Sequence, residues 1–93
     1  MIRTFADSRT RRVFARDRVP DFSPELQRAA WKELAILHAA GSIQDLRVPP
    51  GSRLEKLSGR QEGQYSIRIN DQWRVCFEWK DGDAYEVEIV DYH

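Results

Sequence analysis

The chain has 93 residues, enough for one domain with a single modest core, and its 15 arginines and lysines balance its 15 aspartates and glutamates. A neutral protein does not bind nucleic acid through bulk charge, so any such binding requires a local cationic patch. Charges interrupt every apolar run, so we expect no membrane span. Cys76 is the only cysteine, which excludes an internal disulfide. Because the first residues also lack the apolar stretch of a secretory signal, we expect a cytoplasmic location.

The first 22 residues are predicted to contain a short strand and a basic helix. Residues 2–5 are compatible with a strand that pairs with a later one. Asp7 or Ser8 can cap a helix over residues 9–16, in which Val13 and Phe14 are the only large apolar side chains. Residues 1–18 carry six arginines and two aspartates. This helix is either a solvated arginine face or a contact surface for RNA or an acidic partner.

A second helix is predicted from Ser23 to about Ala40. Ser23 is a good N-cap, Pro24 suits the first helical position, and Gly41 is a stop signal. Apolar residues recur at helical spacing, so one face of this helix should cover a sheet. They are Leu26, Ala30, Leu34 and Leu37. His38, in the last turn, is interpreted as a capping or surface residue and not as a ligand.

The last part of the chain is predicted to form an antiparallel sheet. Residues 53–57 can form a short strand, and residues 65–69, 73–79 and 85–89 alternate apolar and polar side chains with turn-forming residues between them. Ten residues are predicted for the core face: Tyr65, Ile67, Ile69, Trp73, Val75, Phe77, Trp79, Tyr85, Val87 and Ile89. The order strand, helix, helix, then four strands predicts one α+β domain over residues 1–93.

Several kinds of chemistry lack their sequence signals. There is no glycine-rich phosphate loop and no dinucleotide fingerprint. The two histidines and the single cysteine do not have zinc-ligand spacing, and Cys76 is interpreted as a packing residue because nothing near it in sequence lowers its pKa. We therefore expect no metal and no cofactor.

The remaining candidates fit cleavage of RNA, whose own 2′-hydroxyl can attack the adjacent phosphate. Such an enzyme needs an acid, a base and cations that stabilise the charge of the transition state. His93 can move protons, Arg74 can supply fixed positive charge, and Tyr92 can contact phosphate or stack on a base. Flanking phosphates can be held by Arg53, Lys56, Arg60 and Arg68. The alternative is that Asp91, Tyr92 and His93 are only a frayed end.

Strand alternation groups only part of this set. Arg74 points away from the predicted core face, together with Cys76 and Glu78, as does Arg68 on its own strand. By the same alternation His93 would point to the core face, as Val87 and Ile89 do. Either the chain bends after Val90, or His93 does not lie beside Arg74.

Three segments, residues 49–59, 63–77 and 87–93, closely resemble the HigB toxins of type II toxin–antitoxin systems, in the RelE superfamily. The resemblance extends over the full length, and the Trp73–Arg74 pair with the terminal Asp91, Tyr92 and His93 makes it specific. It implies two helices packed on a curved, mainly antiparallel sheet of about four to five strands. It also implies an mRNA interferase that acts in the ribosomal A site and is neutralised by a HigA-type helix-turn-helix antitoxin, with operator DNA contacted only through that antitoxin.

The resemblance also implies a catalytic group. It carries over to Arg74, Asp91, Tyr92 and His93, with Lys56 as a phosphate contact. Some relatives have a histidine where this chain has Glu55, so the role of base falls to Glu55 or moves to His93.

Two other functions remain open from the sequence. A toxin of the same fold can block a protein such as gyrase without catalysis, which predicts that loss of Tyr92 and His93 leaves growth inhibition intact. A non-enzymatic module can act only within an antitoxin repressor complex, which predicts no toxicity on expression alone.

Overall fold

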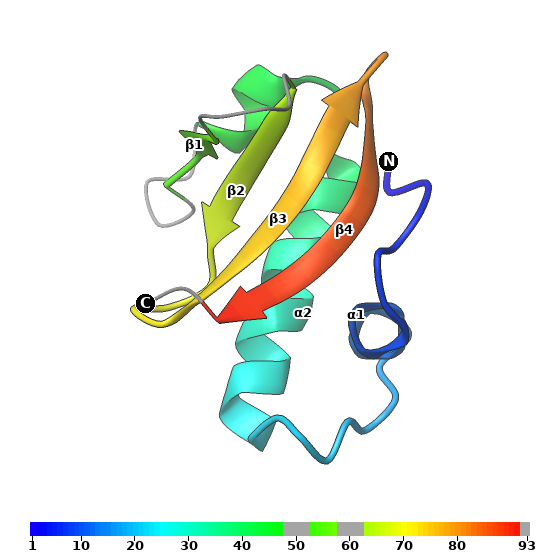
Figure 1. The fold of residues 1–93 in the computed structure, drawn as a ribbon, viewed down its shortest axis with the longest axis vertical. Coiled ribbons are helices and arrows are strands. Elements are labelled where there is room, and N and C mark those ends of the chain that lie inside the picture. Colours follow the sequence, from blue (N-terminus) through cyan, green and yellow to red (C-terminus); the bar gives the residue numbers. More distant parts are fainter. Residues whose placement is uncertain (48–52, 58–62, 92–93) are drawn as a thin grey trace.

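Two helices pack on one face of a four-stranded antiparallel sheet with the strand order β1-β2-β3-β4 (Figure 1). The computed structural model describes residues 1–47, 53–57 and 63–91. Its elements are α1 (Ser8–Phe14), α2 (Pro24–Ala39), a 3-10 turn η1 (Ile43–Leu46), β1 (Glu55–Lys56), β2 (Gln64–Arg68), β3 (Trp73–Lys80) and β4 (Asp83–Asp91). The predicted α+β class and the antiparallel meander are confirmed.

Both helices begin where their capping residues predict. The Asp7 carboxylate accepts a hydrogen bond from the Thr10 N–H at 2.8 Å, and the Ser23 hydroxyl accepts one from the Leu26 N–H at 3.1 Å. Helix α1 ends at Phe14, two residues before the predicted end, because Arg16 adopts a left-handed backbone conformation with φ of +64°. Neither helix in the described part of the chain is long and apolar enough to cross a membrane.

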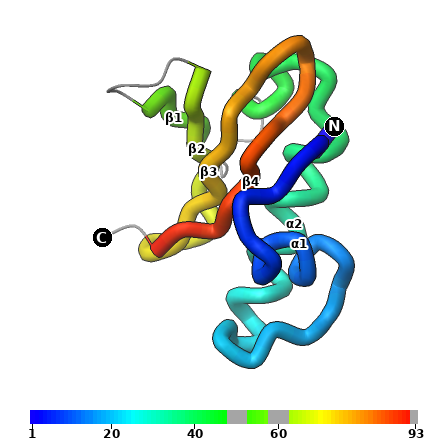
Figure 2. The backbone as a smooth tube through the Cα atoms, turned by 45° about the vertical axis from the view of Figure 1, so that its right-hand side comes forward, coloured from blue at the N-terminus to red at the C-terminus, as the bar shows by residue number. Residues whose placement is uncertain are grey.

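The segment 2–6 runs parallel to β4 but is not a regular strand, so the strand predicted for residues 2–5 is wrong, whereas its pairing with a later strand is confirmed. It forms two isolated bridges, Ile2 with Ala84 and Phe5 with Val87. The Ala6 N–H donates to the Val87 carbonyl at 2.9 Å. Figure 2 shows this segment lying along the edge of β4, where it covers backbone groups that would otherwise be open to another chain.

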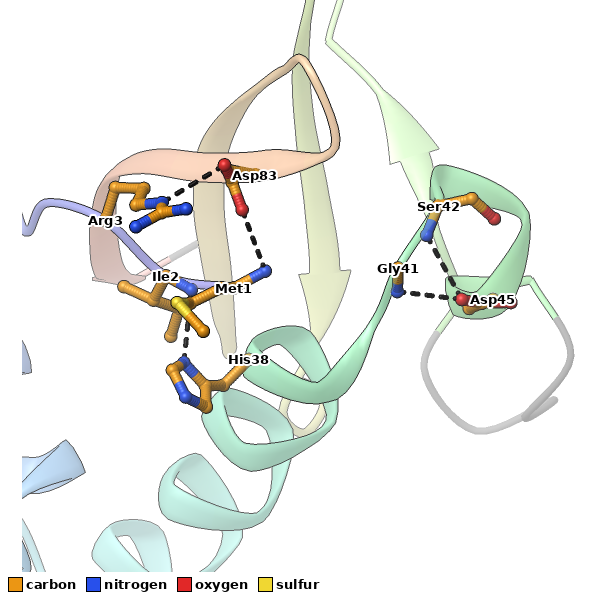
Figure 3. A network of polar contacts seen from close by, with 8 residues as sticks. All are labelled: Met1, Ile2, Arg3, His38, Gly41, Ser42, Asp45 and Asp83. Atoms are coloured by element: carbon orange, nitrogen blue, oxygen red, sulfur yellow. Dashed lines mark hydrogen bonds and ion pairs between the residues drawn. The ribbon is translucent and has the colours of Figure 1, made fainter.

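His38 helps to hold this segment, so its interpretation as a capping or surface residue is wrong. Its Nδ1 atom accepts a hydrogen bond from the Ile2 N–H at 3.1 Å (Figure 3). Its ring also lies 5.1 Å from that of Phe14. On the other side of the segment, Arg3 Nε forms an ion pair with Asp83 Oδ2 at 3.1 Å. The segment is thereby joined to the end of α2 and to the start of β4.

The core lies between the helices and the sheet. On the sheet side, five of the ten residues predicted for this face are buried, namely Ile67, Val75, Phe77, Val87 and Ile89. Four more are partly buried and pack against the core, namely Tyr65, Ile69, Trp73 and Trp79. From the helical side, the predicted stripe Leu26, Ala30, Leu34 and Leu37 is buried.

Tyr85 is the one wrong prediction on this face, because a β-bulge shifts the alternation of β4. The register passes from Cys76 opposite Glu88 to Glu78 opposite Tyr85, so β4 has one residue more than β3 in this interval. Glu86 sits in the bulge with φ of +52°. As a result Ala84, and not Tyr85, is the fully buried residue at the start of β4.

Candidate functional site

The candidate site lies on the face of the sheet that points away from the helices, called here the outer face and marked by Ser66 and Arg74. On β3, Trp73 packs edge-on against Phe22 of the core at a ring distance of 5.4 Å, and Val75 is fully buried. Arg74 lies between them in sequence and therefore points to the other side. In Figure 2 the helices lie to one side of β2, β3 and β4, and β1 continues the sheet beyond β2, away from the helices.

Arg74 is held by hydrogen bonds to protein groups on the outer face. Its Nε donates to the Ser66 hydroxyl at 2.8 Å, and its Nη2 donates to the Arg53 carbonyl at 2.7 Å and to the Ser66 carbonyl at 3.3 Å. The residue is only 7% exposed, and Ser66 is fully buried. Because charged donors make strong hydrogen bonds, this arrangement fixes both the position and the plane of the guanidinium.

Glu55 is the acid beside this cation. Its Oε2 lies 3.9 Å from Arg74 Nη2, and its side chain is 56% exposed. The register of β1 with β2 sets Glu55 opposite Ser66, so Glu55 shares the outer face. The segment before it turns sharply, since Arg53 has φ of +43° and presents its carbonyl oxygen to Arg74. The structure thus brings Arg53, Glu55 and Arg74 together.

The other described candidates lie around this group in different ways. Arg68 is opposite Arg74 in the register of β2 and β3, and its guanidinium pairs with Asp71. Lys56 is opposite Tyr65, which places it on the helical face at the edge of the sheet and not beside Glu55. Asp91 is exposed at the end of β4, where its Oδ2 accepts a hydrogen bond from Gln72 Nε2 at 3.2 Å.

Three predicted site residues, Arg60, Tyr92 and His93, lie outside the described residues. The convergence of His93 with Arg74 therefore stays a prediction. The described part of β4 ends near Arg74, because Val90 is the direct partner of Arg74 across β3 and β4 and Asp91 is opposite Trp73.

Cys76 also lies on the outer face but is not an activated nucleophile. Burial raises the pKa of its thiol, the nearby Glu88 carboxylate raises it further, and the Arg74 charge opposes these effects. The thiol is therefore neutral near pH 7. In the described ranges, no three side chains of His, Cys, Asp or Glu come together in a way that could hold a metal ion.

Two residues of the site were missed by sequence reasoning. Ser66 was given no role, although its hydroxyl accepts a hydrogen bond from Arg74 Nε at 2.8 Å. The signal for Ser66 was a small hydroxyl side chain at a strand position where the alternation predicts exposure. Gln72 gave no signal, because its contact with Asp91 depends on how the turn between β2 and β3 lies against the end of β4.

The arrangement provides a fixed cation, Arg74, an adjacent exposed carboxylate, Glu55, and a second arginine, Arg68, opposite Arg74 on the outer face. Such a surface is suited to an extended anionic polymer, because backbone phosphates are bound by arginines and a transition state with extra negative charge is stabilised by a preorganised guanidinium.

Two solved structures share the fold of this chain. A solved structure described as the YoeB–YefM complex from Staphylococcus aureus matches with a TM-score of 0.63 at 16% sequence identity, covering all of this chain and 98% of that chain. The YoeB dimer from the same organism matches with a TM-score of 0.54 at 17% identity, over 99% of this chain and 97% of that chain. At these identities the likeness shows the fold alone.

Sequence comparison then gives the family. The sequence model of the HigB-like toxins, described as RelE-like toxins of the type II toxin–antitoxin system HigB, matches residues 3–93, and the chain belongs to this family. Toxin HigB-1 of Vibrio cholerae serotype O1 is 48% identical over 59 residues, which are 63% of this chain and 62% of that protein. Endoribonuclease HigB of Proteus vulgaris is 42% identical over 41 residues, 44% of this chain and 45% of that protein. The matched stretches thus span less than two thirds of these relatives.

Proposed function

We propose that this protein is an endoribonuclease toxin that cuts messenger RNA in the ribosomal A site and thereby stops translation. The observation that carries the proposal is the Arg74 guanidinium, fixed on the outer face by Ser66 and the Arg53 carbonyl and flanked by the Glu55 carboxylate. Membership of a toxin family with a relative named as an endoribonuclease supports the same activity.

In the proposed reaction the 2′-hydroxyl of the RNA attacks the adjacent phosphate and the bond to the 5′-oxygen breaks. If Glu55 accepts the proton of the 2′-hydroxyl, His93 is the acid that protonates the leaving oxygen. If His93 is the base instead, another acid protonates that oxygen. Arg74 stabilises the extra negative charge on the phosphate oxygens. Tyr92 positions the substrate, and Asp91 orients the catalytic end of the chain. Since RNA supplies the nucleophile, these steps require no metal ion.

The flanking cations are assigned to the RNA backbone. Arg68 is opposite Arg74 on the outer face, the backbone carbonyl of Arg53 contacts Arg74, and Arg60 lies outside the described residues. Lys56, at the sheet edge, would contact phosphates further along the strand. These contacts set register and affinity but not sequence preference.

The proposed partner is a HigA-type helix-turn-helix antitoxin, through which the complex would reach operator DNA. Two findings support an antitoxin partner: the chain belongs to a type II toxin–antitoxin family, and a protein of the same fold is known in the YoeB–YefM complex. An activity on translating ribosomes places the protein in the cytoplasm.

The test is mRNA cleavage in a purified translation reaction with the wild-type protein, an Arg74→Ala/His93→Ala double variant and an Arg28→Ala control on α2. We expect cleavage at positions in the A site with the wild-type and control proteins and none with the double variant. Equal cleavage by all three proteins would remove the assignment. Growth arrest on expression, relieved by co-expression of a HigA-type antitoxin, tests the partner.

A second candidate function is a toxin that blocks a protein target such as gyrase without catalysis. It is favoured by one observation: Arg74 is only 7% exposed, as expected of a residue that joins residues 53–55 to the sheet. This candidate predicts that Arg74→Ala lowers toxicity only as far as it lowers the stability of the fold.

A further inference from the structure

A cationic groove lies between α2 and the segment that follows α1, and none of the candidate site residues lines it. It has a volume of about 570 Å³, within the range of ligand pockets. Its floor includes Val13, which is fully buried, and the partly buried ring of Trp31. Its rim carries Arg16, Arg18, Arg28 and Lys32, and no acidic side chain is among the described residues that line it.

The cations of this groove are arranged in two ways. Arg18 is fixed, because its Nη1 donates to the carbonyls of Val19 and Phe22 and to the Gln27 side chain at 2.7 to 2.8 Å. Arg28 and Lys32 are exposed, one helical turn apart on α2, and neither has an ion pair within the described residues. Their positive charge is therefore available to an anion from outside.

Arg16 and Trp31 decide which kind of anion fits. The Arg16 guanidinium carbon lies 3.7 Å from the centroid of the Trp31 ring, so one face of the ring is already covered. A nucleobase that stacked on this face would have to displace the arginine. The apolar floor, in contrast, suits an aliphatic or aromatic side chain, which a ribose-phosphate chain does not offer.

From this geometry we infer that the groove binds an acidic, amphipathic segment of a partner protein, with an apolar side chain on the part of Trp31 that Arg16 leaves exposed and carboxylates at Arg28, Lys32 and Arg16. Charge complementarity selects the acidic segment, since the groove has four cations on its rim in a chain of zero net charge. The groove belongs to the helical layer, whereas Arg74 points to the outer face of the sheet, because its neighbours Trp73 and Val75 pack on the core side. A segment bound there leaves the outer face open.

The inference goes beyond the proposed function and does not depend on RNA cleavage. The test is binding of a fluorescein-labelled peptide with leucines at helical spacing and glutamates between them, measured by anisotropy at low salt. The full-length protein is compared with Arg28→Glu/Lys32→Glu and with Arg47→Glu/Lys80→Glu, a control with the same change in net charge at exposed positions outside the groove. Thermal melting checks that all three proteins are folded.

We expect the groove variant to lose affinity for the peptide by about tenfold or more, because like charges then face each other, while the control variant loses little. Replacing the glutamates by glutamine, or the leucines by serine, should weaken binding to the wild-type protein. Equal affinity of the groove variant and the wild-type protein, or equal loss in both variants, overturns the inference. So does a result in which the groove variant loses affinity for a labelled single-stranded RNA but not for the peptide.

Discussion

Ser66 and Arg74 are joined diagonally across β2 and β3 by a hydrogen bond of 2.8 Å from the arginine Nε to the serine hydroxyl. The hydroxyl is fully buried, so no water replaces it as an acceptor when it is removed. Through this bond a neutral side chain on one strand sets the orientation of the cation on which the proposed chemistry depends.

Ser66→Ala should therefore lower both stability and activity. Loss of the buried acceptor should cost about 1–3 kcal/mol in the free energy of unfolding, measured in urea. Ser23→Ala, which removes the N-cap of α2, is the matched control, because it should cost about 1 kcal/mol but lies away from the outer face. The account predicts reduced RNA cleavage for Ser66→Ala only. If both serine variants lose activity in proportion to stability, Ser66 does not orient Arg74 for function.

The stability of the N-terminal segment should depend on pH through Asp83. The hydrogen bond from Arg3 is the main cause that lowers the pKa of this carboxyl below its ordinary value of 3.8. A lowered folded pKa means that the stabilisation is complete above the unfolded pKa and is lost as the pH falls through the folded pKa. The difference in melting temperature between wild-type protein and Asp83→Asn should be constant near neutral pH and should shrink below about pH 4. A difference that persists unchanged at the acid end would contradict this ion pair.

The Cys76 thiol should react slowly with alkylating reagents in the folded protein. Its pKa is raised above the ordinary value of 9.0, mainly by burial. We expect the rate of reaction with iodoacetamide to increase only at a higher pH than in the urea-unfolded chain, where the thiol has its ordinary pKa. Rapid reaction of the folded protein at neutral pH would mean that the thiolate is stabilised.

The bulge in β4 can be tested with a pair of glycine variants. Glu86 has φ of +52°, which costs a residue with a side chain roughly 1–2 kcal/mol, whereas Glu88 is in the regular part of the strand. Glu86→Gly should therefore be less destabilising than Glu88→Gly by about 1 kcal/mol or more, as measured by urea unfolding. Equal destabilisation would indicate that residue 86 has an extended backbone conformation in solution.

The parts of the fold that were predicted correctly depend on short-range chemistry. Asp7 and Ser23 act on an N–H group three residues away, and the alternation in residues 65–69 and 73–79 follows directly from strand geometry. The register of a meander with short turns then follows from these two patterns.

The errors occur where backbone conformation is set by distant contacts. Arg16 and Glu86 adopt positive φ values that the sequence does not signal, since neither is glycine or asparagine. The Glu86 N–H donates to the Thr4 hydroxyl at 2.8 Å, so this conformation depends on a segment more than eighty residues away. The bond from the Ile2 N–H to His38 likewise joins positions that no local pattern connects.

The candidate site shows the same division. Alternation was sufficient to place Arg74 and Arg68 on the outer face. It did not reveal that Ser66 and the Arg53 carbonyl would bind Arg74, because those contacts depend on the side-chain direction of Arg74 and on the positive φ of Arg53. For Lys56 the strand alternation was available, but its partner Tyr65 was not known until the register of β1 was seen.

The most direct test of the central claim is the rate of mRNA cleavage by Arg74→Lys in a purified translation reaction, with Arg28→Lys as the matched control. Lysine keeps the charge but lacks the planar set of donors that holds the Arg74 side chain against Ser66 and the Arg53 carbonyl. We expect a loss of about 10²–10³-fold in cleavage rate for Arg74→Lys and little change for Arg28→Lys. Cleavage by Arg74→Lys within a few-fold of wild type, with the fold intact, would contradict the role assigned to the Arg74 guanidinium.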